Sequence, residues 1–134
     1  MTMPIRLATI AALLLGVPTI AAAQDVAKGE AIFKRCATCH GIGDATKPIA
    51  PNLNGVVGRV AGTQEDFLKK YSKAMVAAGE GGLVWTEADI DAYITDPKKK
   101  VPGNKMAFPG LKKADERADV IAYIKTFSPE AASQ

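Results

Sequence analysis

The segment "RCATCHG" at positions 35–41 holds both cysteines of the chain and its only histidine. Two thiols three positions apart, followed directly by an imidazole, have the Cys-x-x-Cys-His spacing that attaches haem covalently. In such a site Cys36 and Cys39 would bond to the two vinyl groups of one haem, and His40 would project toward the iron. A disulfide, a thiol–disulfide exchange pair and a zinc site are the alternative uses of these residues.

The remainder of the sequence weighs against two of these alternatives. A thiol–disulfide exchange pair is expected within a βαβ unit, and no stretch here has the alternating pattern of a strand. A zinc site needs further ligands, and there is no third cysteine or second histidine to provide them. A disulfide between Cys36 and Cys39 stays open. The motif favours covalent haem attachment, with one haem per chain.

The lack of a second histidine directs the search for a second axial ligand to methionine. Met75 has helical spacing with Tyr71 and is expected to pack in the core. Met106 lies in "PGNKMAFPG", where Pro and Gly fix the backbone without a helix, so it is the predicted axial ligand. Packing as a core filler is its alternative role. Two filled axial positions favour electron transfer, whereas an open iron would indicate a peroxidase or a gas-binding protein.

The first 23 residues have the layout of a secretory signal peptide. A short positive region with Arg6 precedes the apolar stretch "LATIAALLLGVPTI", and "AAAQ" supplies small residues for cleavage after Ala23. An uncleaved membrane anchor is the alternative, although the apolar stretch is short and is interrupted by Pro18. We therefore predict a signal peptide over residues 1–23 and one exported, soluble domain over residues 24–134.

The charge of that domain is small. Without Arg6, 16 basic and 14 acidic residues give a net charge of +2, which does not indicate a general nucleic-acid binder. The basic residues are nevertheless uneven and predict a local basic face for an acidic partner, although solvated lysines on a loop are the simpler alternative. Six lysines fall within sixteen positions: Lys98, Lys99, Lys100, Lys105, Lys112 and Lys113.

The elements that must position these residues are predicted to be helices joined by long loops. Residues 25–39 predict a helix capped by Asp25, and residues 47–62 predict an ordered loop. A capping pair, Thr63 with Asp66, predicts a second helix that ends at "GEGG", residues 79–82. "TEAD" at 86–89 predicts a third helix closed by Pro97, and a last helix is expected over about residues 115–127. The fold class is all-α.

Five ordered stretches together resemble class I cytochrome c, in particular the bacterial periplasmic members similar to mitochondrial cytochrome c. The resemblance covers residues 25–127 and implies the cytochrome c fold, with short helices and long loops around one covalently bound haem. Two positions, Met75 and Asn104, depart from the family pattern near the inner haem propionate. The stretches are "GEAIFKRCATCH" (29–40), "PNLNGVVGR" (51–59), Trp85 with the helix after it, "DPKKKVPGNKMAF" (96–108) and "ERADVIAYIK" (116–125).

The resemblance also implies roles for individual residues. Gly29 and Phe33 would pack against Val120 and Tyr123, where the first and last helices cross. The Pro51 carbonyl would accept the N–H of the His40 imidazole. The remaining implied roles are inner propionate contacts for Arg59, Tyr71 and Trp85, a hydrogen bond from Tyr93 to the methionine sulfur, an aromatic at the haem edge for Phe108, and partner docking for Arg35, Lys98, Lys99 and Lys105.

By resemblance, the function is single-electron transfer in the periplasm by a monomer. The implied donor is a membrane bc-type complex, and the implied acceptor is a terminal oxidase or a photosynthetic reaction centre. A dedicated electron acceptor of one periplasmic dehydrogenase is the alternative. No enzymatic activity and no nucleic-acid partner are expected.

Overall fold

The computed structural model describes residues 24–129, so the predicted signal peptide and the last five residues lie outside the described part. Within it, helices and loops surround a single core, and an isolated bridge between Val60 and Val84 is the one β-type pairing. The predicted all-α class is confirmed. The helices are α1 (Val26–Phe33), α2 (Lys73–Glu80), α3 (Glu87–Thr95), α4 (Pro97–Lys100) and α5 (Ala114–Lys125), with a 3-10 turn, η1 (Glu65–Phe67), before α2.

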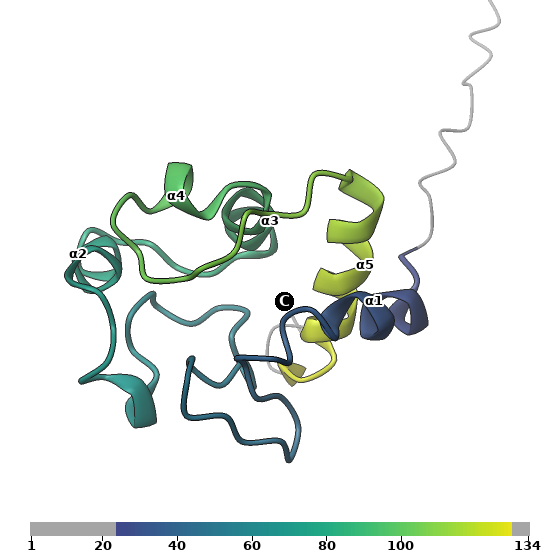
Figure 1. The fold of residues 1–134 in the computed structure, drawn as a ribbon, viewed down its shortest axis with the longest axis horizontal. Coiled ribbons are helices and arrows are strands. Elements are labelled where there is room, and N and C mark those ends of the chain that lie inside the picture. The colour runs from purple at the N-terminus through teal and green to yellow at the C-terminus, as the bar shows by residue number, and fades with distance from the viewer. Residues whose placement is uncertain (1–23, 130–134) are drawn as a thin grey trace, which may run out of the picture.

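The first and last helices cross in close contact, as Figure 1 shows. Gly29 permits this crossing because a Cβ at that position would lie 2.0 Å from the Asp119 carbonyl oxygen. The Phe33 and Tyr123 ring centroids are 5.3 Å apart, and Val120 is 1% exposed. The predicted packing of α1 against α5 is therefore confirmed, and it ties the two ends of the described chain together.

Helix α1 is shorter than predicted. Asp25 caps it as expected, since its carboxylate accepts the Lys28 N–H at 3.0 Å. The α-helix ends at Phe33 instead of continuing to Cys39. The cause is a change in hydrogen bonding, because Arg35 N–H donates to Ile32 and Cys36 N–H to Phe33, three residues back instead of four. The chain is wound more tightly here as it enters the cysteine motif.

The predicted start of the second helix is wrong. The Thr63 hydroxyl donates to the Val60 carbonyl, 2.7 Å away, and caps no helix. Helix α2 begins instead after Ser72, whose buried hydroxyl accepts the Met75 N–H at 3.0 Å. Residues 65–67 form only the 3-10 turn. Tertiary contact explains the later start, because Gly79 of α2 lies directly on the Ala61 carbonyl, where a Cβ would be 1.9 Å from the oxygen.

The two remaining predicted helices are close to their expected bounds. Thr86 and Asp89 cap α3, since the Thr86 hydroxyl accepts the Asp89 N–H at 3.1 Å. Pro97 follows the end of α3 and begins the short helix α4. Helix α5 starts one residue before the predicted position and ends two residues before it. No helix within residues 24–129 has the length and apolar character needed to cross a bilayer.

Candidate haem site

The cysteine motif forms a compact turn directly after α1. His40 N–H and Cys39 N–H both donate to the Cys36 carbonyl, at 2.9 and 3.0 Å. Both cysteines are free thiols and half-buried. Burial raises the pKa of the Cys36 thiol to about 11, so the thiol stays protonated at neutral pH. Exchange catalysis needs a thiolate with a lowered pKa, and this environment therefore disfavours the thiol–disulfide alternative.

The His40 imidazole is oriented by the backbone of a neighbouring loop. Its Nδ1 lies 2.8 Å from the Pro51 carbonyl oxygen, and because a carbonyl only accepts, Nδ1 must carry the proton. Burial lowers the pKa of His40, which keeps the ring neutral at pH 7. A neutral ring protonated on Nδ1 leaves the Nε2 lone pair available to a metal.

The loop that carries the Pro51 carbonyl is bonded to the residues just after His40. Leu53 N–H donates to the Gly41 carbonyl at 2.9 Å. The Asn54 amide brackets Gly43, accepting its N–H at 2.7 Å and donating to its carbonyl at 2.8 Å. We name residues 40–54 the His40 segment; hydrogen bonds within it hold the ring, and Arg59 and Lys70 add bonds from outside to its Asn52, Asn54 and Pro48 carbonyls.

The three residues assigned by resemblance to the inner propionate, Arg59, Tyr71 and Trp85, lie near one another. Trp85 N–H donates to the Arg59 carbonyl at 2.8 Å, which joins their two segments. Burial lowers the pKa of Arg59, and the nearby Tyr71 hydroxyl partly offsets that shift. The Arg59 guanidinium also donates to the Asn52 and Asn54 carbonyls at 2.9 and 2.5 Å. A cationic group is thus held in a partly buried position next to the His40 segment.

Tyr93 lies on α3 against Trp85, with ring centroids 4.9 Å apart. Burial raises the pKa of Tyr93 to about 12. Tyr93 is half-buried, and the predicted bond from its hydroxyl to the Met106 sulfur stays a prediction. Phe108 is half-buried and packs against the edge of the core.

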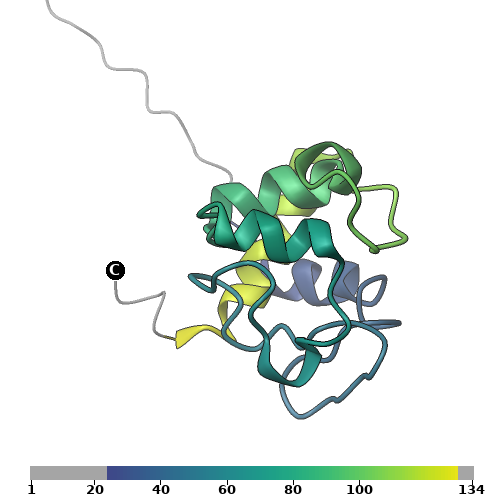
Figure 2. The same ribbon diagram turned by 90° about the vertical axis from the view of Figure 1, so that its left-hand side faces the viewer.

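Met106 lies in an irregular stretch between α4 and α5, residues 101–113, which we name the Met106 segment. The Met106 N–H donates to the Asn104 side-chain oxygen at 2.8 Å, and the Asn104 amide donates to the Pro97 and Val101 carbonyls. In Figures 1 and 2 this segment runs above the centre of the fold and the His40 segment below it. Met75, in contrast, is 8% exposed and lies in the core, as predicted.

The lysines that cluster in the sequence have different surroundings in the structure. Lys98, Lys99 and Lys105 are exposed, and the Lys105 ammonium group donates to the Lys70 carbonyl at 3.3 Å. Arg35 is also exposed and lies 4.0 Å from Glu116. The other three are engaged elsewhere: Lys100 pairs with Asp89 at 2.6 Å, Lys113 with Glu116 at 3.4 Å, and Lys112 donates to backbone carbonyls.

Sequence reasoning missed one residue that contacts the Met106 segment. Arg117, near the start of α5, donates to the carbonyls of Leu111 and Lys112 and to the carboxylate of Asp91. A positive charge near a helix N-terminus is unfavourable unless an acidic partner offsets it. The position of Arg117 in the predicted last helix was therefore a signal that a tertiary contact exists.

The donor set fits a covalently attached haem. It offers two free cysteines, of which Cys36 packs against the apolar core, a neutral imidazole with a free Nε2, and a thioether on an irregular segment. Within residues 24–129 no cluster of three or more His, Cys, Asp or Glu side chains could hold a metal ion, which disfavours the zinc alternative.

Comparison with known proteins agrees with this fit. A sequence profile of the family described as Cytochrome c matches residues 26–128. The chain belongs to the cytochrome c family. Among relatives of this cytochrome c, the cytochrome c2 of Agrobacterium tumefaciens is 52% identical over 101 residues, which are 75% of this chain and 89% of the relative. The cytochrome c2 of Blastochloris viridis is 46% identical over 115 residues, covering 85% and 87% of the two chains.

Solved structures of cytochrome c2 share the fold. The structure from Rhodospirillum centenum superposes with a TM-score of 0.71 at 44% identity, over 78% of this chain and 99% of the other. That from Rhodobacter sphaeroides gives 0.70 at 36% identity, over 78% and 96%. The resemblance to class I cytochrome c is thereby confirmed. As a cytochrome c, the protein is an electron carrier and not an enzyme, with haem c bound covalently; Cys36 and Cys39 have the required spacing.

Proposed function

We propose that this cytochrome c carries single electrons on a haem anchored through Cys36 and Cys39, with His40 and Met106 as the axial ligands. The observation that carries the proposal is the bond from His40 Nδ1 to the Pro51 carbonyl, which frees Nε2 in the same turn as two free cysteines. When bound, the haem supplies a one-electron exchange between Fe(II) and Fe(III). The Pro51 carbonyl orients the imidazole, and the Met106 thioether raises the reduction potential.

Arg59, Tyr71 and Trp85 are proposed to surround the inner propionate. Their donors would offset the cost of burying a negative charge. Support comes from the partly buried cationic group of Arg59 and from its backbone link to Trp85. The Asn104 amide already donates to the Pro97 and Val101 carbonyls, and Met75 has no donor and lies in the core, so neither is proposed as a propionate donor.

Tyr93 and Phe108 are proposed to border the haem on the side of Met106. The Tyr93 ring is half-buried against Trp85, and its hydroxyl is a donor for the methionine sulfur. Phe108 lies at the edge of the core and lines a surface pocket together with Lys98. This arrangement supports an exposed haem edge next to basic residues.

Arg35, Lys98, Lys99 and Lys105 are proposed to dock acidic redox partners. These exposed positive charges attract an acidic partner and so speed the encounter. Contacts between exposed charges also break easily, as rapid turnover of a carrier requires. Following the resemblance, the proposed donor is a bc-type complex, and the acceptor is a terminal oxidase or a photosynthetic reaction centre. The name cytochrome c2 of the relatives supports this assignment. We propose a soluble periplasmic monomer released from residues 1–23 by cleavage.

The experiment is a comparison of visible absorption spectra after maturation in a periplasm with haem-attachment machinery. Wild-type protein is expected to keep its haem after denaturation and to show a low-spin spectrum with the weak far-red sulfur-to-iron band. Met106→Leu removes the thioether and should lose that band. Met75→Leu is the matched control, because it replaces the other methionine of residues 24–129, and it should keep the band.

Loss of the band in Met75→Leu but not in Met106→Leu would show that Met75, and not Met106, is the axial ligand. A high-spin wild-type spectrum would contradict axial ligation by both residues. In that case carbon monoxide binding to the reduced protein would indicate ligand binding or catalysis instead of electron transfer.

A further inference from the structure

The Met106 segment is bonded to the protein at both of its ends. On the N-terminal side, Asn104 joins the Met106 N–H to the carbonyls of Pro97 and Val101. On the C-terminal side, Leu111 N–H donates to the Ile94 carbonyl at 2.7 Å, and Leu111 is 3% exposed. The stretch between these two attachments carries Met106, so its freedom depends on how firmly each end is held.

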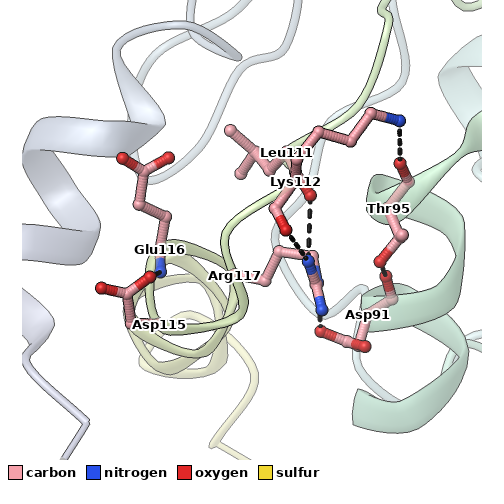
Figure 3. Close-up of polar contacts among 7 residues, drawn as sticks. All are labelled: Asp91, Thr95, Leu111, Lys112, Asp115, Glu116 and Arg117. Carbon is pink, nitrogen blue, oxygen red and sulfur yellow. Dashed lines mark hydrogen bonds and ion pairs between the residues drawn. The ribbon is translucent and has the colours of Figure 1, made fainter.

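The C-terminal attachment is reinforced by Lys112 and Gly110. The Lys112 ammonium group donates to the carbonyls of Thr95 and Pro109, at 2.9 and 3.3 Å. Gly110 has φ +105°, and a Cβ there would lie 2.2 Å from the Thr95 carbonyl oxygen. The segment therefore lies directly on the last turn of α3, as Figure 3 shows for Lys112 and Thr95.

Arg117 is the third group that holds the C-terminal end of the Met106 segment. It differs from Lys112 and Gly110 because it is also paired with a carboxylate, that of Asp91. Its Nη1 group donates to the Leu111 and Lys112 carbonyls at 3.0 and 3.1 Å, and its Nε donates to the Asp91 carboxylate at 2.7 Å. Figure 3 shows the guanidinium between the segment and α3. The Arg117 side chain is only 13% exposed, whereas Asp91 is 44% exposed.

The planar guanidinium links these contacts geometrically. Nε and Nη1 are fixed in one rigid plane, so an acceptor that holds Nε also sets the direction of the two Nη1 N–H bonds. Without Asp91, a mostly buried cation would lose its carboxylate partner and would turn toward solvent. Asp91 therefore acts on the Met106 segment without touching it.

We propose that Asp91 is a positioning residue that, through Arg117, limits how often the Met106 segment opens and releases Met106 from the iron. This inference rests on the proposed axial role of Met106. It assigns a function in ligand retention to a charge on α3 that lies outside the haem contacts named above. Asp91 is accessible enough for substitution without loss of the fold.

The test compares Asp91→Ala with Glu87→Ala in the haem-loaded protein. Glu87 is the matched control, because it also joins α3 to α5, through Lys125, but does not contact the Met106 segment. The first measurement is the limiting rate at which imidazole binds to the ferric protein, which reports opening at the iron. The second is hydrogen exchange at the Leu111 N–H, which reports opening of the segment itself.

Asp91→Ala is expected to raise both rates about fivefold, the effect of losing one charge-assisted hydrogen bond at a partly exposed site. Glu87→Ala should leave both rates within about twofold of wild type. Asp91→Asn keeps an oxygen that accepts from Nε and should fall between wild type and Asp91→Ala. Equal increases in Asp91→Ala and Glu87→Ala, or no increase in Asp91→Ala, would overturn the inference.

The two proposals can fail separately. A wild-type spectrum without the far-red band would remove Met106 as a ligand and contradict the proposed axial set. Exchange at Leu111 would still show whether Asp91 holds the segment. With the band present, unchanged imidazole binding in Asp91→Ala would overturn this inference alone.

Discussion

The His40 segment and the Met106 segment hold their proposed ligands by different kinds of contact. His40 follows directly on the cysteines, and its ring is fixed by Pro51, eleven residues away. Met106 has one local contact, through Asn104, and otherwise depends on α3 and α5. A ligand fixed by near neighbours in the sequence keeps its place when the tertiary structure loosens. A ligand whose segment is held by the packing of two helices is expected to leave first, so the two sides of the iron should differ in stability.

The largest expected effect comes from crowding the Met106 segment at Gly110. Gly110→Ala should lower the free energy of unfolding by about 3 kcal/mol, because a Cβ would lie 2.2 Å from the Thr95 carbonyl oxygen and the backbone is left-handed. Gly103→Ala is the control, since φ is +87° there but the nearest atom, the Ala74 Cβ, is 3.2 Å away, and it should cost about 1 kcal/mol. Urea denaturation measures both. Similar losses in the two variants would mean that the left-handed backbone alone, and not the contact with Thr95, causes the loss of stability.

A smaller effect separates the two segments by their asparagines. Asn54→Ala removes two hydrogen bonds to Gly43 and should cost about 1 kcal/mol of unfolding free energy, with little change in imidazole binding. Asn104→Ala should cost a similar amount but should also speed imidazole binding, because the Met106 N–H loses its acceptor. Denaturation and stopped-flow binding give the two values. Faster binding in Asn54→Ala would contradict the proposed difference between the segments.

The smallest effect at neutral pH concerns Tyr93, on the helix that holds the Met106 segment. Burial raises the pKa of Tyr93 to about 12 from an ordinary value of 10.0. The unfolded chain therefore loses this proton first, and stability should fall as pH rises from about 10 to about 12. Tyr93→Phe should lack this contribution to the slope, as measured by urea denaturation across that range. An unchanged slope would show that Tyr93 is not the titrating group.

The sequence predicted those features whose partners lie close together along it. The Thr86 cap of α3 depends on a residue three positions away, and the structure confirms it. The cap at Thr63 has the same spacing and is wrong, because burial of Ser72 and the contact between Gly79 and Ala61 determine where α2 starts. No local pattern distinguishes the two cases.

In the candidate site, too, contacts between residues close in the sequence could be predicted, and contacts between distant residues could not. The Cys-x-x-Cys-His spacing alone indicated the haem, and the family resemblance added the Pro51 carbonyl. The pair of Asp91 with Arg117 spans 26 positions and joins two helices, so neither periodicity nor a motif reveals it. Its position depends on how α3 and α5 pack, which only the folded chain defines.

The crossing of α1 and α5 has a consequence for how the protein is made. The partner of the first helix is the last one, so α1 cannot bury Gly29 and Phe33 until Ala114–Lys125 have been synthesised. During synthesis the chain therefore cannot complete this crossing until its last helix has been made. A chain that stops before Ala114 lacks the surface against which its beginning must pack, which makes completeness of the polypeptide a condition for its folding.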